Sequence, residues 1–421
     1  MIATEILRRY QVWYGPGESP DGPLPIVDWG KQMSLRVRHA VMSLVLAGGI
    51  AVAGLPALTA AQDATPMASP ESMGPPPAPD YATVVATGLA NPRGLFVDAD
   101  GNLWIAESGI GGDGPCAMGP EGNEECMGES GGITKVSADG TQERVLDALA
   151  SRAAKDGSSA TGPNDVAVLE NQIYVLMGYG GDPATRVDLG TEDELGWLMV
   201  DDGTGLKPVA DIAGYETISN PDGMAFDANP YSLVPAAEGA MVVSDAGQNA
   251  LLNVTAEGEI STLTVFPNRD AKAPDGSMIP MNPVPTGVTS DANGDLVVGE
   301  LTGFPFPVGG ANVYTVSPNG GEPTSTLDGF TNVIDVAVGP DGSTYVLEML
   351  KGSMLGINPD DPSTMDGQLT RVSLDGTRTV VASEGLVWPT GVAVDADGNI
   401  YVATWGVMGN MGQVWKIAPP A

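Results

Sequence analysis

The sequence predicts an all-β fold, a six-bladed β-propeller whose blades are four-stranded antiparallel sheets. One unit of strands and turns recurs along the chain from residue 81 onward. The composition is rich in turn formers, with 57 Gly and 35 Pro, whereas aromatic residues make up only 5%. The last unit lacks a strand, and an unassigned strand precedes the first unit. A propeller is the repeat fold that joins such units into a ring.

Each repeat unit begins with two short apolar strands joined by an Asp-Gly or Asn-Gly turn. The pattern is clear in residues 91–107, 284–300, 332–348 and 388–404, and degenerate in 162–177 and 220–245. Such turns accept the positive φ angles of a tight hairpin, and the flanking Val, Ile and Leu residues pack between neighbouring sheets. A third and a fourth strand follow, as in 367–376 and 377–386. Four antiparallel strands per unit make a propeller blade.

One residue in each predicted innermost strand anchors the blade count. The anchors are Gly94, Asp165, Gly223, Gly287, Asp335 and Gly391, and they predict six blades. The last blade ends after three strands, whereas the segment YATVVATGL at 81–89 resembles the fourth-strand segment TRTVVASEGL at 377–386. We therefore predict that strand 81–89 completes the sixth blade and closes the ring, which removes an exposed edge.

The residues before the propeller carry the pattern of an export signal. Residues 1–32 are a predicted non-translated or disordered extension, with translation starting near Met33. Residues 33–61 have a basic start, an apolar stretch and small residues before a cleavage site, as in a signal peptide. An uncleaved membrane anchor is the alternative. Residues 62–80 are a Pro- and Ser-rich linker and 81–421 the propeller. We expect a secreted protein without membrane insertion after cleavage.

Charge and histidine content exclude several classes of function. The chain has 18 basic and 53 acidic residues, a net charge of −35. Such a surface repels phosphates, so we exclude nucleic acid and anionic membranes as partners. The only histidine, His39, lies in the predicted signal peptide. The mature chain would then lack Ser-His-Asp or Cys-His catalysis and His-ligated zinc. The only two cysteines, Cys116 and Cys126, predict a disulfide in an exported protein.

Long insertions follow the second strands, at 108–130, 178–195, 301–310, 349–366 and 405–411. We expect them on the face where the innermost strands begin, and long ordered loops on a rigid scaffold usually carry function. The candidate ligand-binding residues of this face are Asn91, Arg93, Phe304, Phe306 and Trp405.

Acidic residues end four of the six second strands, and others lie near the starts of innermost strands. Together they predict a ring of oxygen ligands at one end of the channel, and hard cations such as Ca²⁺ take six to eight oxygens. Ca²⁺ is therefore the candidate cofactor. The alternative is that these acids cap loop amides. The DADGN segments at 98–102 and 395–399 lack an EF-hand's further ligands and are predicted hairpin turns. The candidate metal ligands are Glu107, Asp165, Asp222, Asp245, Glu300, Asp335 and Glu348.

Several strings resemble a known family. The recurrent NPxGxxxDxDGNxYVAx pattern resembles NHL-type propellers. The strings MGYGGDPATR (177–186), NPDGMAFDANPYSL (220–233), VGELTGFPFPVGG (298–310) and FTNVIDVAVGPDGSTYVLEM (330–349) are similar to the ScyD/ScyE family across 81–421. The resemblance implies an exported propeller and supplies no catalytic residues to carry over.

Three classes of function remain open from the sequence. The first is a binding or accessory propeller that holds a small molecule or glycan, with or without Ca²⁺. The second is a metal-dependent enzyme resembling gluconolactonase and strictosidine-synthase propellers, with Glu107, Glu300 or Asp335 as ligand or base. A quinone-dependent sugar dehydrogenase is disfavoured because those propellers use a catalytic His. The third is a protein-interaction ring in which exposed Phe304 and Phe306 dock a partner; the alternative for these two side chains is that they pack back onto the ring.

Overall fold

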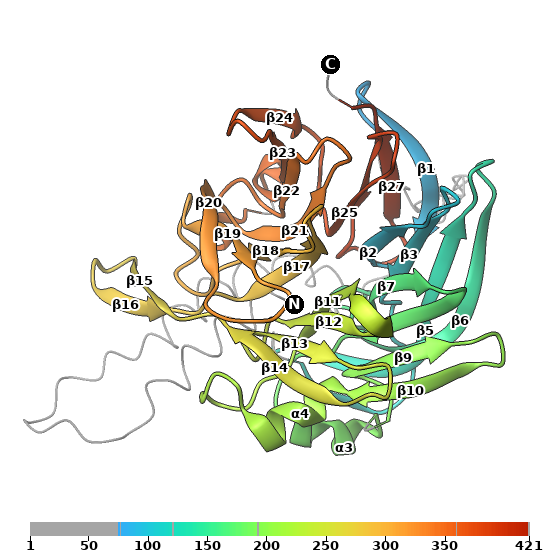
Figure 1. Cartoon of the computed structure of the whole chain (residues 1–421). Helices are drawn as coiled ribbons and strands as arrows, with labels where there is room; N and C mark the ends of the chain where they lie inside the picture. Colours follow the sequence, from blue (N-terminus) through green and yellow to red (C-terminus); the bar gives the residue numbers. More distant parts are fainter. Residues whose placement is uncertain (1–74, 76, 120–121, 192, 359, 420–421) are drawn as a thin grey trace, which may run out of the picture. The chain divides into compact units, whose positions relative to one another are not determined.

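The computed structural model describes residues 75, 77–119, 122–191, 193–358 and 360–419. Within them the chain forms six sheets of four or more antiparallel strands arranged around an axis, which confirms the six-bladed propeller (Figure 1). The predicted extension 1–32, the predicted signal peptide 33–61 and most of the predicted linker 62–80 lie outside the described residues. No helix in the described part of the chain is long and apolar enough to cross a membrane.

The first three blades run outward from the axis in chain order. The first contains β2 (Pro92–Val97), β3 (Leu103–Glu107), β5 (Glu124–Val136) and β6 (Gln142–Ala154). The second contains β7 (Pro163–Leu169), β8 (Gln172–Met177), β9 (Trp197–Asp201) and β10 (Leu206–Asp211). The third contains β11 (Pro230–Pro235), β12 (Met241–Asp245), β13 (Ala250–Val254) and β14 (Ile260–Val265).

The other three blades complete the ring. The fourth contains β17 (Pro285–Ser290), β18 (Leu296–Glu300), β19 (Ala311–Val316) and β20 (Thr324–Phe330). The fifth contains β21 (Val333–Val338), β22 (Thr344–Glu348), β23 (Gln368–Val372) and β24 (Arg378–Ala382). The sixth contains β25 (Gly391–Val394), β26 (Ile400–Thr404), β27 (Gly412–Ile417) and β1 (Ala82–Leu89).

Strand β1 closes the ring as predicted. It pairs antiparallel with β27, from Ala82 opposite Ile417 to Leu89 opposite Gly412. The innermost strands contact each other all the way round, in the order β2, β7, β11, β17, β21, β25 and back to β2. Ala86 and Leu89 are buried in the core between the sixth and first blades. The ring is therefore held by strand pairing and apolar packing contributed by both ends of the propeller.

The repeats fold for the reasons that the sequence indicates. In the DADGN turn of the first blade the Asp98 carboxylate accepts the backbone N–H groups of Asp100 and Asn102, and Gly101 has a φ of +78°. The turn at 395–399 repeats this arrangement around Asp395. Both segments are hairpin turns, as predicted. The strands that they join are apolar and buried between blades, with Ile105 and Val402 fully buried.

The prediction for the third blade was wrong in register. Helix α4 (Ile212–Ser219) occupies the space before it, and Asn220 caps the helix in a left-handed conformation with a φ of 40°. The innermost strand β11 starts only at Pro230, which pairs with Asp245. Ser232 is therefore the third anchor, in place of Gly223. The string NPDG at 220–223 resembles the strand starts elsewhere, but here it ends a helix.

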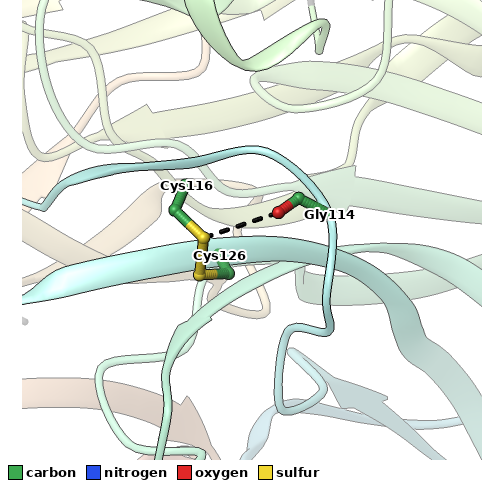
Figure 2. The surroundings of a disulfide bond; sticks show 3 residues. All are labelled: Gly114, Cys116 and Cys126. Atoms are coloured by element: carbon green, nitrogen blue, oxygen red, sulfur yellow. Dashed lines mark hydrogen bonds between the residues drawn. A yellow bond between two sulfur atoms is a disulfide. The ribbon is translucent and has the colours of Figure 1, made fainter.

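Several elements lie outside the regular blades. Strand β4 (Cys116–Met118) pairs with the extended start of β5, and the predicted disulfide Cys116–Cys126 joins the two (Figure 2). Hairpin β15 (Arg269–Lys272) and β16 (Met278–Met281) lies between the third and fourth blades. The short helices are η1 (Pro183–Thr185), α3 (Arg186–Leu189), η2 (Ala237–Gly239), η3 (Met354–Gly356) and η4 (Pro362–Met365).

Candidate functional site: an acidic pocket on the axis

The strand registers bring the insertions to the end of the axis where the innermost strands begin. Pro163 at the start of β7 lies opposite Met177 at the end of β8, and Pro285 lies opposite Glu300 in the same way. An insertion that follows a second strand therefore starts beside the mouth of the ring. This is the face on which the sequence predicted the long loops.

A small pocket lies among the starts of the innermost strands. It has room for about one water molecule or one bare cation. Five of the six blades contribute to its wall, and all of the lining residues except Gly94 have an oxygen atom in the side chain. The lining residues are Gly94, Asn164, Asp165, Tyr231, Ser232, Asp335 and Thr390.

Asp165 enters this pocket while joining two blades. Its Oδ2 accepts the Ser232 hydroxyl at 2.8 Å and the Leu233 backbone N–H at 2.8 Å, both from the third blade. Its Oδ1 accepts the Val166 N–H at 2.8 Å. Gly94 of the first blade lies against this carboxylate, and a Cβ there would collide with Oδ1. The side chain is thus fixed in place by its own blade and by both neighbouring blades.

Asp335 repeats the arrangement three blades further on. Its Oδ2 accepts the Val392 N–H of the sixth blade at 2.7 Å and its Oδ1 accepts the Val336 N–H at 2.9 Å. Gly287 of the fourth blade takes the place of Gly94, and a Cβ there would collide with the Asp335 carboxylate. Because the second and fifth blades are opposite in a ring of six, the two carboxylates approach the pocket from opposite sides.

The pocket is electrostatically unusual because Asp165 is buried and Asp335 is partly buried. Burial raises the pKa of Asp165 to about 6. Burial also raises the pKa of Asp335 well above its usual range, and the negative charge of Asp165 raises it further. Neither carboxylate forms an ion pair with a Lys or Arg among the described residues. Such a pair favours the uptake of a proton or a cation.

Arg93 and Asn91, two of the predicted ligand-binding residues, form hydrogen bonds within the protein. Arg93 is 5% exposed, and its guanidinium donates to the Ser108 hydroxyl at 3.2 Å and to the Ala160 carbonyl at 2.9 Å. Burial lowers its pKa. Asn91 is fully buried and donates to the carbonyls of Gly109 and Gly157 at 2.7 and 2.8 Å. These two residues hold the insertion loops in place.

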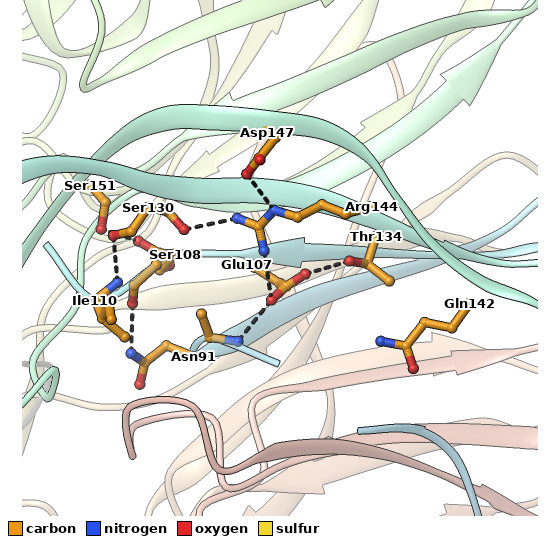
Figure 3. A network of polar contacts seen from close by, with 12 residues as sticks. Asn91, Glu107, Ser108, Ile110, Ser130, Thr134, Gln142, Arg144, Asp147 and Ser151 are labelled. Carbon is orange, nitrogen blue, oxygen red and sulfur yellow. Dashed lines mark hydrogen bonds and ion pairs between the residues drawn. The ribbon is translucent and has the colours of Figure 1, made fainter. Parts of the chain in front are cut away.

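Glu107 holds together the polar network of the first blade (Figure 3). Its carboxylate accepts the Ala90 N–H at 2.7 Å and the Thr134 hydroxyl, and it pairs with Arg144 at 3.1 Å. Arg144 also pairs with Asp147 at 2.8 Å. The Glu107 side chain is 2% exposed, and both of its oxygens interact with donors from the protein. Glu107 is not among the residues that line the axial pocket.

The other acids that end second strands have the same task. The Asp245 carboxylate accepts the Asn229 N–H at 2.8 Å and that of Glu348 accepts the Thr331 N–H at 2.7 Å. In both blades the donor lies just before the innermost strand, as Ala90 does in the first blade. In the fourth blade this position is Pro283, which has no N–H. Glu300 instead accepts the Asn312 N–H at 2.8 Å and pairs with Arg269 at 2.5 Å.

The seven predicted metal ligands do not form one ring. In the described part of the chain no three of them bring carboxylate oxygens within 4.8 Å of one another. The only group that meets this criterion there is Cys116, Glu124 and Cys126, whose sulfurs are joined in the disulfide. The structure brings Asp165 and Asp335 to the axis and places Asp222 after α4. Glu107, Asp245 and Glu348 cap loop amides, which is the alternative that the sequence left open, whereas Glu300 binds the N–H of Asn312 in β19 and pairs with Arg269.

Phe304 and Phe306, predicted as an exposed aromatic pair, pack against the propeller in the structure. Phe306 is 1% exposed and lies in the core cluster that contains Val284 and Leu350. Phe304 is partly buried and packs edge-on against Phe306, with ring centroids 6.1 Å apart. Trp405 is half-buried. The two phenylalanines anchor the insertion 301–310 to the propeller, so they are not an exposed pair that docks a partner.

The sequence-based list of site residues omitted Tyr231 and Ser232 because the third blade was misaligned. The sequence does contain a pattern that marks the start of β11. Pro230 begins β11 after Asn229, just as Pro92 begins β2 after Asn91, and Pro163 and Pro285 begin two further innermost strands. Proline fits the start of a strand, where no ladder hydrogen bond is lost. The NPDG segment at 220–223 resembles the starts of the other innermost strands more closely than Asn229-Pro230 does, so the sequence places the strand too early.

Comparison with known proteins assigns this chain to no family. No protein-family model matches the chain, and no curated protein matches it. Solved structures that resemble it include a streptogramin B lyase, at 12% identity over 80% of this chain and 96% of that one, with a TM-score of 0.42. The calcium-binding protein regucalcin from Agrobacterium tumefaciens matches at 12% identity over 80% and 92%, TM-score 0.44. The PQQ-bound aldose sugar dehydrogenase from Streptomyces coelicolor matches at 14% over 79% and 96%, TM-score 0.46.

Proposed function

We propose that this chain is a binding propeller that holds a divalent cation, Ca²⁺ by preference, in the axial pocket, and through it a small molecule on the insertion face. The observation that carries the proposal is the pair of carboxylates of Asp165, which is buried, and Asp335, which is partly buried. Both line one pocket and neither has a basic partner among the described residues. A cation offsets their mutual repulsion and their loss of solvation.

The donor set suits a hard cation. Each oxygen of Asp165 and Asp335 accepts one or two hydrogen bonds from the protein, and a carboxylate oxygen offers further lone pairs. The Asn164 carbonyl and the hydroxyls of Ser232 and Thr390 line the same space. Oxygen atoms of these kinds, together with water, are the ligands that Ca²⁺ takes. The ligand of the bound cation would enter between the insertions.

The proposal includes export and membership of the ScyD/ScyE family. The disulfide Cys116–Cys126 supports an exported location because such bonds persist in oxidising compartments. The family strings quoted above map onto the insertions and innermost strands that surround the pocket. A glycan or another protein on the insertion face remains compatible with the same geometry.

Calorimetric titration of the purified, EDTA-treated protein with Ca²⁺ tests the axial site. The wild type should bind the ion, and the Asp335→Asn variant should lose the axial binding event. Asp139→Asn removes an exposed carboxylate on a hairpin turn and serves as the matched control, with binding unchanged. Identical isotherms for the wild type and the Asp335→Asn variant would refute the axial assignment.

A metal-dependent hydrolase is the second candidate function. The observation that favours it is that Asp165 and Asp335 line one water-sized pocket, in which a carboxylate beside a bound cation could accept a proton from water. Lactone hydrolysis by the Ca²⁺-loaded protein should then fall by a factor of about 10²–10⁴ in the Asp165→Asn variant. Absence of turnover in the wild type, with binding intact, would leave the binding role alone.

A further inference from the structure

We propose that a second cation site, separate from the axis, lies beside the third blade, where Glu216 of α4 meets Asp222, Asp227 and Asp245. Helix α4 and the segment that follows it lie between the second and third blades in the chain. Glu216 projects from this helix, Asp222 and Asp227 come from the segment, and Asp245 ends β12. Glu216 and Asp227 belong to none of the assignments made above, and Asp245 has so far been explained only as a turn residue.

The four carboxyls form one electrostatic cluster. Glu216 and Asp245 are fully buried and Asp227 is 9% exposed. Burial raises the pKa of the Glu216 carboxyl, and the charges of Asp245, Asp222 and Asp227 raise it further, to about 8. No Lys or Arg among the described residues forms an ion pair with Glu216 or Asp245. Buried carboxylates without a countercharge are costly unless they bind a proton or a metal.

An unused oxygen points to a metal ligand. Glu216 is fully buried, yet its Oε2 has no hydrogen-bond partner, and its Oε1 receives only the Asp227 N–H at 3.4 Å. The Oε1 of Gln248, also fully buried, is unpartnered too, although its Nε2 donates to Asp245 at 3.0 Å and to the Ile212 carbonyl at 3.1 Å. Buried oxygens are normally hydrogen-bonded. A bound cation would give a partner to both the Glu216 carboxylate oxygen and the Gln248 amide oxygen.

The carboxylates alone do not make a compact metal site. No three of the carboxylates bring oxygens within 4.8 Å of one another. Water and amide oxygens, such as Gln248 Oε1 and Asn220 Oδ1, must therefore complete the coordination. Ca²⁺ tolerates such mixed, irregular sites, whereas Mg²⁺ demands a tight octahedron. We therefore expect weak affinity, in the range of about 0.1–1 mM that is typical of extracellular calcium modules.

Bound Ca²⁺ would connect α4 to the third blade. The Asp245 carboxylate already accepts the N–H groups of Asn229, Gly247 and Gln248, and Asp222 accepts the Asn249 side-chain amide at 2.7 Å. A cation among these acids would tie the helix and the segment 220–229 to the turn between β12 and β13. The site would act as a structural clamp on the insertion face.

The test uses the Asp335→Asn variant, in which the axial site is already removed, so that the two proposals fail separately. At about pH 8, about 10 mM Ca²⁺ should raise its Tm by roughly 2–4 °C, and Mg²⁺ should have a smaller effect. Adding Glu216→Gln, which keeps the size of the side chain and removes its charge, should abolish the rise. Adding Glu257→Gln, an exposed residue of the same blade, should leave it intact.

Two outcomes would overturn the second site. One is an Asp335→Asn variant whose Tm does not respond to Ca²⁺. The other is a response that the Glu216→Gln change leaves at full size. A variant that melts cooperatively but is less stable still reports the Ca²⁺-dependent shift. Calorimetric titration of the wild type counts the bound Ca²⁺ ions independently. Two ions are expected if both proposals hold and one if only one holds. The Asp335→Asn and Glu216→Gln changes then identify the occupied site.

Discussion

At the scale of the residue, glycine positions decide where the axial carboxylates can lie. Gly94 and Gly287 are innermost-strand residues of the first and fourth blades, and each lies against the aspartate of the next blade. Neither glycine has a positive φ, so the requirement is for space and not for an unusual backbone conformation. The absence of a side chain creates the room that Asp165 and Asp335 occupy.

Substitution of Gly287 tests this packing. Gly287→Ala should lower the free energy of unfolding by roughly 1–3 kcal/mol, because the new methyl group collides with the Asp335 carboxylate and with the backbone of Asp335 and Val336. Chemical denaturation measures the loss. Gly352→Ala is the matched control, since a Cβ there meets no atom within 4 Å and should be nearly neutral. Equal effects at both positions would show that the close approach at Gly287 is unimportant.

Glu107 gives a second test at this scale. Glu107→Ala leaves the Ala90 N–H, the Thr134 hydroxyl and Arg144 without their acceptor, and a buried charge pair broken on one side costs about 3–5 kcal/mol. Arg144 is partly exposed and keeps Asp147, so we expect the lower part of that range. Glu143→Ala, on the exposed side of β6, should change the denaturation midpoint little. A midpoint that stays unchanged for Glu107→Ala would show that the network does not contribute to stability.

At the scale of the element, strand β1 makes the sixth blade complete. It covers the outer edge of β27 and buries Leu89 in the core. Without it, β27 would present a row of unpaired backbone groups, which is the setting for edge-to-edge association.

Truncation tests the role of this strand. A chain that begins at residue 90 should show a lower Tm and should form dimers or larger species through β27 in gel filtration. A synthetic peptide of residues 81–89 should restore both properties in part. A truncated protein that remains monomeric with an unchanged Tm would contradict the closure of the ring by β1.

The elements also show what the sequence could predict and where it failed. Strand pairs with an Asp-Gly or Asn-Gly turn were recognisable because the turn geometry restricts which residues fit, and β1 was recognisable because of its likeness to the fourth strand of the fifth blade. The start of β11 was missed because NPDG at 220–223 serves a helix end. The roles of Glu300 and Glu348 could not be read from spacing, because hydrogen-bond partners such as Asn312 and Thr331 are determined by tertiary contacts.

At the scale of the whole molecule, buried carboxyls should make stability depend on pH in an unusual direction. Burial raises the pKa of Asp165 to about 6 and that of Glu348 to about 7. The folded protein therefore holds these protons at pH values where the unfolded chain has released them. The resulting stabilisation is complete below the unfolded pKa of about 4 and is lost as the pH rises through about 6 to 7.

Thermal melting in EDTA should therefore show a Tm that falls from about pH 5 to about pH 8. Repulsion within the net charge of −35 acts in the same direction, so the series should be repeated at about 0.5 M salt, which screens exposed charges much more than buried ones. The Glu348→Gln variant should show a flatter profile than the wild type. A Tm that rises over this interval would mean that the buried acids are ionised and well solvated.

The central claim is that the axial pocket binds a divalent cation between Asp165 and Asp335. The most direct measurement is an anomalous difference map from crystals of the protein soaked in a lanthanide that substitutes for Ca²⁺. We predict a peak on the propeller axis within coordination distance of both carboxylates, and its disappearance in the Asp335→Asn variant. A map with peaks elsewhere and none on the axis would contradict the account.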